Sequence, residues 1–128
     1  MRLLLDTCTF LWLNGDLGKL PPRVLEACES LENELFLSAI SAWEIAVKWA
    51  AHRLTLPQEP AVWVPSRRER NGIASLAVTE EAVLQVTKLP ALHRDPFDRM
   101  LVCQAIVEGL AVVTPDPLIR QYPVRVLW

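Results

Sequence analysis

Three carboxylates in this chain follow short apolar runs, in a way that could bring them together. Asp6 directly ends the run at residues 2–5, Glu44 lies just after a second run, and Asp116 follows a third run by two residues. Carboxylates that share a partly buried site repel one another, and a bound divalent cation removes that repulsion. Mg²⁺ and Mn²⁺ prefer carboxylate and water oxygens, and such ions activate water for attack on phosphodiesters. The acids therefore indicate a metal-dependent hydrolytic centre.

Each of these acids also has a purely structural interpretation, and the sequence leaves both open. Glu44 completes a Ser-x-x-Glu pattern that begins at Ser41 and precedes an apolar helix, which is typical of a capping box. Asp116 can cap a helix begun by Pro117, and Asp6 can accept hydrogen bonds from the N–H groups of the turn that follows it.

A fourth acid, Asp98, lies in the first turn of the most clearly marked helix of the chain. Asp95 followed by Pro96 is a strong start signal, because Asp caps free N–H groups and Pro suits the first helical position. One cap already serves this end, so the helix does not require the carboxylate of Asp98. The helix precedes a strand expected at 110–114. If strands and helices simply alternate, Asp98 should lie at the edge of the sheet opposite to the other three acids, unless a long loop at 89–93 brings it to their edge.

The segments that must position these acids alternate between apolar runs and helical patterns. Strands are predicted at residues 2–5, 35–38, 72–76, 110–114 and 124–127, with helices near 10–13, 21–32, 41–52, 60–70 and 95–108 and short helices after 79–81 and after 115–117. We expect Thr7 or Thr9 to cap the first helix, Thr79 to cap a later one, and Gly109 to end the last. The alternation predicts an α/β fold with three layers: a central, mostly parallel sheet of about five strands with helices on both faces.

Composition limits the class of protein. The chain has 128 residues and is 52% hydrophobic, which suits one domain with a real core, and no apolar run approaches the ~18 residues needed to span a membrane. Cys8, Cys28 and Cys103 lack Cys-x-x-Cys spacing, and with two isolated histidines they predict neither a zinc site nor disulfides. A reduced, cytoplasmic protein with no membrane partner is expected. The net charge of −2 argues against binding nucleic acid by bulk charge, but not against an enzyme acting on it.

Taken together, these segments resemble the PIN-domain ribonucleases, and most closely the VapC-type toxins of prokaryotic toxin–antitoxin pairs. The resemblance covers essentially the whole chain. It rests on Leu-Leu-Asp-Thr at 4–7, Ser-Ala-Trp-Glu-Ile at 41–45 and, most specifically, His-Arg-Asp-Pro-Phe-Asp-Arg-Met-Leu at 93–101. Val-Thr-Pro-Asp at 113–116 and Val-Leu-Trp at 126–128 also match.

The resemblance implies a single PIN-like nuclease domain over residues 1–128, acting as a Mg²⁺- or Mn²⁺-dependent endoribonuclease toxin. By position, Asp6, Glu44, Asp98 and Asp116 match the family's acidic quartet, which binds the metal and carries the catalysis. It also implies that Asp98 reaches the shared site, which strand order alone does not show. Asp6 and Asp98 would be the main ligands, Glu44 would hold a ligand water or a second metal, and Asp116 would orient water.

Four further residues are candidates for supporting roles beside the quartet: Thr7, Ser41, Asp95 and Arg99. Thr7 and Ser41 can add hydroxyl contacts or act as caps, and Asp95 is an outer cap. Arg99 can pair with a site carboxylate, with a phosphate, or with neither.

The resemblance further implies an RNA substrate, a cognate antitoxin protein and a homodimer. We expect the antitoxin to lie in an apolar groove on the Trp-bearing helices, near residues 10–13 and 43–50. The basic residues that could contact the RNA backbone are Lys48, Arg53, Arg67, Arg68 and Arg70.

Two other classes of function remain open. An aspartyl-phosphate phosphatase or phosphoacceptor domain would use Asp6 as its nucleophile. Phosphatases of the haloacid-dehalogenase type want Asp-x-Asp-x-Thr, however, and this chain has Cys8 where the second Asp would stand. A non-catalytic partner-binding module would use the acids only as caps, and Mg²⁺ would not stabilise it.

Overall fold

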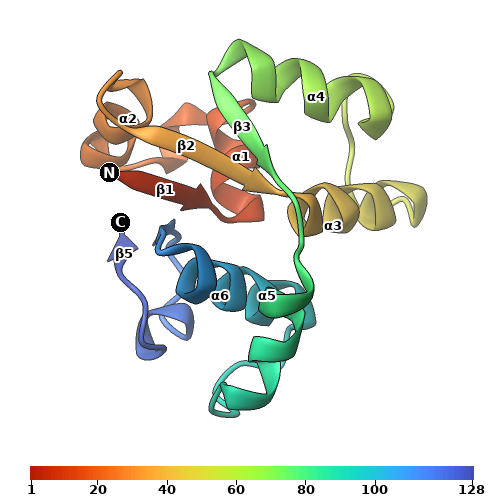
Figure 1. The fold of residues 1–128 in the computed structure, drawn as a ribbon. Coiled ribbons are helices and arrows are strands. Elements are labelled where there is room, and N and C mark those ends of the chain that lie inside the picture. Colours follow the sequence, from red (N-terminus) through yellow and green to blue (C-terminus); the bar gives the residue numbers. More distant parts are fainter.

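A computed structural model describes residues 1–128 and contains one five-stranded sheet in which every strand pairing is parallel. Across the sheet the strands are β3 (Ile73–Leu76), β2 (Glu34–Ser38), β1 (Arg2–Leu5), β4 (Ala111–Val113) and β5 (Val126–Leu127). The first strand of the chain therefore lies in the centre of the sheet (Figure 1). The predicted α/β class and strand number are confirmed, although the last strand is shorter than predicted.

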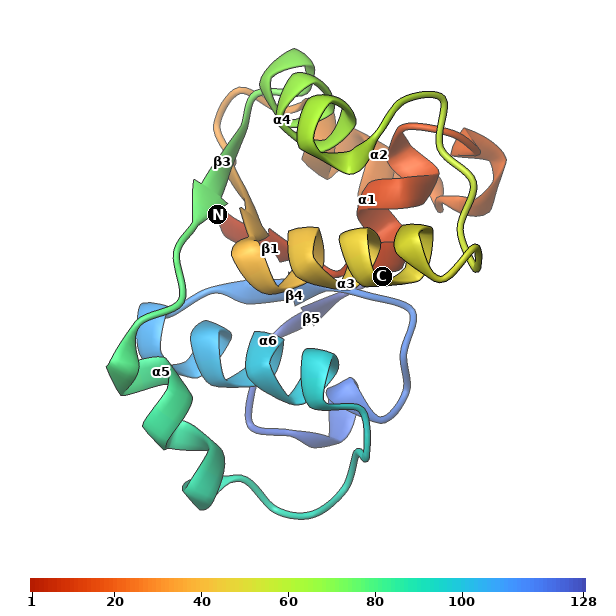
Figure 2. The ribbon, with the colours of Figure 1, turned by 90° about the vertical axis from the view of Figure 1, so that its right-hand side faces the viewer.

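Helices cover both faces of the sheet. They are α1 (Thr7–Leu13), α2 (Pro22–Glu29), α3 (Ala39–Ala50), α4 (Pro60–Arg70), α5 (Glu80–Leu84) and α6 (Pro96–Glu108), with 3-10 turns at η1 (Leu17–Lys19), η2 (Gln85–Lys88) and η3 (Ile119–Gln121). Figure 2 shows α5 and α6 on one side of the sheet and α1, α2 and α4 on the other, which confirms the three layers. None of these helices has both the length and the apolar character that a membrane crossing requires.

The central strand β1 is buried on both faces. Successive side chains of a strand point to opposite faces. Leu3 and Leu5 accordingly join the core under α1, α2 and α4 with Phe10, whereas Leu4 joins the core under α6 with Leu101. All five side chains are fully buried. This double burial explains why the strand reads as an unbroken apolar run that stops only at the first acid.

The signals around α6 and α5 are confirmed. The Asp95 carboxylate accepts a hydrogen bond from the Phe97 N–H at 2.9 Å and so caps α6. Gly109 ends the same helix with φ of 68°, in the left-handed region that favours glycine. Thr79 caps α5 through its side chain.

Two predicted caps are wrong, because each helix begins earlier than its sequence pattern indicates. The cap of α1 is Asp6 rather than Thr7 or Thr9. Helix α3 begins directly after β2, where Ser38 is the cap and accepts a hydrogen bond from a backbone N–H of the first turn. The Ser-x-x-Glu pattern from Ser41 to Glu44 therefore lies inside α3 and forms no capping box, which frees both side chains for other contacts.

Candidate active site

The four predicted acids, Asp6, Glu44, Asp98 and Asp116, line one open cavity of about 230 Å³. Asp6 follows β1 and Asp116 follows β4, so the cavity lies at the carboxyl edge of the sheet, where sites of open α/β sheets form. The alternation argument that put Asp98 at the opposite edge is wrong. Helix α6 feeds β4, so it must end at the amino edge, and its 13 residues span about 20 Å, so it begins at the carboxyl edge.

Asp6 is held from several sides at the end of β1. Its carboxylate accepts hydrogen bonds from the Thr9 N–H at 2.8 Å and from the Thr114 hydroxyl at 2.5 Å, and the Cys8 thiol lies 3.3 Å away. Asp6 is only 4% exposed, and this burial raises the pKa of its carboxyl, although the hydrogen bonds oppose the shift. Thr114 was not among the predicted site residues, although it lies directly after β4, where site residues are expected.

Glu44 enters the cavity from α3 with a partner on each oxygen. The Thr7 hydroxyl donates to Glu44 Oε1 at 2.6 Å, and the Ser41 hydroxyl lies 3.0 Å from that of Thr7. On the other oxygen, Lys48 Nζ lies 2.7 Å from Glu44 Oε2. Thr7 and Ser41 thus stand beside the acid as expected, and they join the first turn of α1 to α3.

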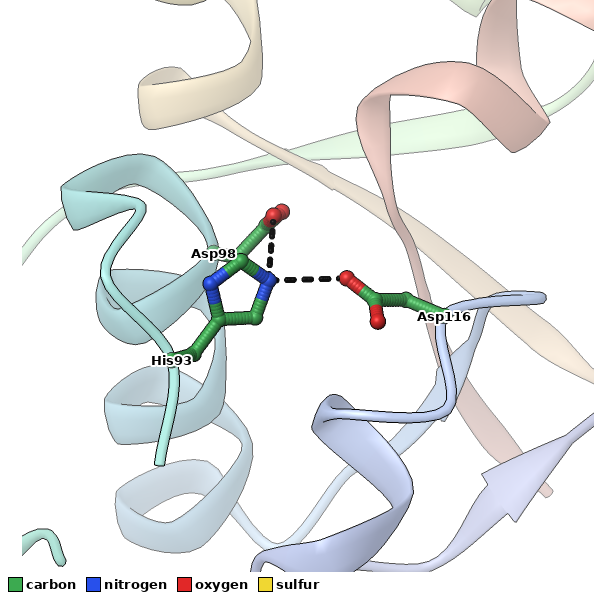
Figure 3. A group of neighbouring side chains, drawn as sticks. All are labelled: His93, Asp98 and Asp116. Carbon is green, nitrogen blue, oxygen red and sulfur yellow. Dashed lines mark hydrogen bonds and ion pairs between the residues drawn. The ribbon is translucent and has the colours of Figure 1, made fainter. Parts of the chain in front are cut away.

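Asp98 and Asp116 face each other across a histidine that sequence analysis missed (Figure 3). His93 Nε2 lies 3.1 Å from Asp98 Oδ2 and 2.8 Å from Asp116 Oδ2. The other oxygen of Asp116 accepts the Leu118 N–H at 2.8 Å and so shapes the turn before η3. The signal for His93 was its place in the most specific motif, two residues before the cap Asp95.

The two remaining candidates differ in what they contact. Asp95 caps α6 and also lines the cavity. Arg99 pairs with no site carboxylate: its guanidinium donates to the Pro90 carbonyl at 3.2 Å and to the Tyr122 hydroxyl at 3.3 Å. Arg99 therefore braces the loop that leads into α6. Of the five predicted RNA-contacting cations, Lys48 alone lines the acidic cavity.

The charge in this cavity is unbalanced. Burial, followed by the nearby Asp95 carboxylate, raises the pKa of Asp98 to about 7, and Asp6 and Glu44 add to the shift. Burial and the Asp6 carboxylate also raise the pKa of the Cys8 thiol, so Cys8 stays protonated and offers no soft thiolate ligand. The donors are thus mostly carboxylate oxygens. That set fits a hard divalent cation such as Mg²⁺ or Mn²⁺ better than Zn²⁺.

The raised pKa of Asp98 predicts how stability depends on pH when no divalent cation is present. Between about pH 4 and pH 7 the folded chain holds a proton on Asp98 that the unfolded chain has lost, so this group lowers stability as the pH rises through that window. Because the site is partly open to water, we expect a loss of only about 1–2 kcal/mol. Urea unfolding in EDTA at pH 5 and pH 8 measures it. Asp98→Asn should weaken the pH dependence, and an equally steep dependence in that variant would contradict the assignment.

Known proteins resemble this chain in sequence over most of its length. The model of the PIN domain matches residues 3–124. Ribonuclease VapC22 of Mycobacterium tuberculosis (strain ATCC 25618 / H37Rv) is 27% identical over 120 residues, which cover 93% of this chain and 90% of that protein. Ribonuclease VapC16 of the same organism is 40% identical over 50 residues, which cover 39% of this chain and 36% of that protein.

The fold is also similar to a solved structure. It matches the crystal structure of VapBC2 from Rickettsia felis, bound to a DNA fragment from their promoter, with a TM-score of 0.75 and 14% identity. The match covers 99% of this chain and 98% of that chain. At this identity the likeness concerns the fold alone.

Proposed function

This chain belongs to the PIN domain family, and on that basis we propose that it is a VapC-type ribonuclease toxin of a toxin–antitoxin pair, working as a Mg²⁺- or Mn²⁺-dependent endoribonuclease. The observation that carries this proposal is the gathering of Asp6, Glu44, Asp98 and Asp116 around one cavity at the carboxyl edge of the sheet. A bound divalent cation offsets the charge of such a cluster and activates water for the hydrolysis of phosphodiesters.

In this proposal the four acids have distinct tasks. Asp6 and Asp98, which come from the centre of the sheet and from α6, are the main metal ligands. Glu44 holds a ligand water or a second cation, and Asp116 orients the attacking water. A divalent cation, when bound, supplies the positive charge that lowers the pKa of water and offsets charge on the phosphate.

The residues around the acids hold them in place for this work. The short hydrogen bond from Thr114 and the cap contact from Thr9 fix the carboxylate of Asp6. Thr7 fixes one oxygen of Glu44, and Lys48 offsets the charge of the other. Lys48 is also 39% exposed in its side chain, so it can meet a phosphate of the RNA backbone beside the scissile bond.

Partners follow from the same proposal. The substrate is RNA, the cognate antitoxin is a protein, and the toxin forms a homodimer. On α3, Trp43 and Val47 lie one turn apart and are 58% and 45% exposed, and adjacent exposed apolar side chains are typical of protein-binding surfaces. This supports the α3 part of the expected antitoxin groove. The cytoplasmic location stays a prediction.

The proposal is tested by cleavage of a mixed RNA pool by the purified protein with Mg²⁺, with EDTA and after Glu44→Gln. We expect cleavage only with Mg²⁺, and a loss of about 10²-fold or more in the variant, since Gln keeps the size of the side chain but removes a charge from the cation site. Glu32→Gln is the matched control, because Glu32 is exposed and lies outside the cavity, and it should cleave normally.

Three outcomes separate the functions. Cleavage that survives both EDTA and Glu44→Gln would contradict a carboxylate–metal nuclease. No cleavage, together with no stabilisation of the fold by Mg²⁺, would favour a binding module. A phosphoryl adduct on Asp6 after incubation with a phosphoryl donor, detected by intact mass, would favour a phosphatase.

A further inference from the structure

His93 sits in the candidate site with both its backbone and its ring held. Its N–H donates to the Tyr122 hydroxyl at 2.9 Å, and Tyr122 is buried in the core under α6. Arg99 also braces this loop, because its guanidinium donates to the Pro90 and His93 carbonyls. The His93 side chain is only 11% exposed. The imidazole therefore has a fixed position between Asp98 and Asp116, rather than being a mobile surface group.

The contacts of the ring identify where its proton lies. The Asp95 backbone N–H donates to His93 Nδ1 at 3.1 Å, so Nδ1 must be an unprotonated acceptor. A ring with an unprotonated Nδ1 carries its one proton on Nε2. That nitrogen lies 2.8 Å from Asp116 Oδ2, to which it donates its proton, and 3.1 Å from Asp98 Oδ2.

This arrangement argues against His93 as a metal ligand. A neutral histidine that binds a metal through Nε2 carries its proton on Nδ1 and donates it to a neighbouring acceptor. Here the neighbour of Nδ1 is an N–H donor from Asp95, and two hydrogens would face each other. The three side chains lie close enough to share an ion, but the tautomer gives the imidazole a different task from the two carboxylates.

We propose that His93 is a positioning residue: in its Nε2–H tautomer it holds the carboxylates of Asp98 and Asp116 side by side and does not bind the metal itself. This inference rests on the proposed function, because it takes these two acids to be part of the cation site. The carboxylates come from α6 and from the turn after β4, and they repel each other. A fixed N–H between them keeps both aimed at the cavity before any cation arrives.

Two substitutions of His93 each keep one of the two contacts of the ring and remove the other. In His93→Gln the amide nitrogen reaches about as far as Nε2 and can still donate to the carboxylates, but the Nδ1 contact is lost. In His93→Asn the amide oxygen takes the place of Nδ1 and still accepts from Asp95, but no donor reaches the carboxylates. The pair therefore separates the bridge to the acids from the support of the loop.

The first readout is Mg²⁺ binding by calorimetry, with no RNA present. Loss of a hydrogen bond to a metal ligand typically weakens metal binding by about 10–100-fold. We expect a loss of about 10-fold in His93→Asn, with His93→Gln much closer to the wild type. Equal affinity in both variants and the wild type, or a weaker His93→Gln than His93→Asn, would overturn the proposal.

The second readout is the tautomer itself, from ¹⁵N chemical shifts of the imidazole in the wild-type protein at pH 8. We expect a protonated Nε2 and an unprotonated Nδ1 both in EDTA and with saturating Mg²⁺. A proton on Nδ1 in the Mg²⁺-loaded protein would make His93 a ligand and overturn the proposal. This measurement needs no variant, so it stands even where a substitution prevents folding.

Failure of this inference can be told apart from failure of the proposed function. If the wild type binds Mg²⁺ with the expected tautomer but cleaves no RNA, the positioning role of His93 holds and the ribonuclease proposal does not. If RNA cleavage depends on Mg²⁺ and on Glu44 while the proton lies on Nδ1, the ribonuclease proposal holds and the positioning role does not.

Discussion

Replacing Asp98 with Asn is expected to slow Mg²⁺-dependent RNA cleavage by about 10³-fold and, at the same time, to stabilise the metal-free protein. A cation at a reaction centre is worth several kcal/mol of transition-state stabilisation, and about 4 kcal/mol corresponds to 10³-fold in rate. Asp98 is one of the two main ligands in the proposed site. Asn keeps the shape of the side chain but removes the charge that holds the cation.

The gain in stability has a separate physical cause. The pKa of Asp98 is raised to about 7 because its carboxylate is buried and lies near Asp95, Asp6 and Glu44. Above pH 7 the folded protein carries that unfavourable charge, and Asn does not. We expect about 1–2 kcal/mol of added stability in EDTA at pH 8, a discounted value for a partly open site.

Both effects are measured on the same preparation, by cleavage rates with Mg²⁺ and by urea unfolding in EDTA. Asp16→Asn is the matched control, since Asp16 is 55% exposed in its side chain and lies 3.8 Å from Lys19 on the surface. It should alter neither quantity. If Asp98→Asn has a lower free energy of unfolding than the wild type, the carboxylate stabilises the fold and the prediction is wrong.

The second large effect concerns Gln104, which is almost fully buried in α6 and ties three segments together. Its Oε1 accepts from the Ser38 hydroxyl at 2.5 Å, and its Nε2 donates to the Ala77 carbonyl at 3.2 Å. Ser38 in turn caps α3, the helix that carries Glu44. We expect Gln104→Leu to lower the free energy of unfolding by about 2–3 kcal/mol, because it leaves a buried hydroxyl without its acceptor.

A double-mutant cycle with Ser38→Ala separates this cause from simple misfit of Leu. If the unpaired hydroxyl is responsible, the double variant loses less stability than the sum of the two single variants. Removing both Ser38 and Gln104 side-chain partners costs less than leaving one of them buried without a hydrogen bond. Additive losses would show instead that Leu packs badly beside β2. Urea unfolding of all four proteins at pH 8 provides the comparison.

Local signals in the sequence predicted local structure well. Asp95 and Gly109 mark the ends of α6 correctly, because capping depends on residues within one turn. The same kind of signal failed at α3, where two serines compete for the cap. Ser38 starts the helix directly after β2, so Ser41 is already inside it and contacts Thr7 instead.

Contacts across the sheet could not be predicted from spacing alone. His93 and Asp116 are 23 residues apart and meet only because α6 begins at the edge where β4 ends. Asp98 was misplaced for the related reason that a helix feeding a parallel strand must start at the carboxyl edge. Once that direction is considered, the topology alone brings all four acids to one edge, whereas the donor and acceptor roles around them require coordinates.

The hydrogen bond from Thr114 to Asp6 also limits how early the site can form during synthesis of the chain. It joins residues 108 positions apart, so the ribosome has to reach residue 114 before the acidic cavity can close. At about 5–20 residues per second, synthesis of these 108 residues takes roughly 5–20 s. During that time Asp6 lacks its partner Thr114. A chain that ends before residue 114 therefore lacks the hydrogen bond that fixes the Asp6 carboxylate from the end of β4. In the proposed toxin, the site therefore forms only after residue 114 has been synthesised.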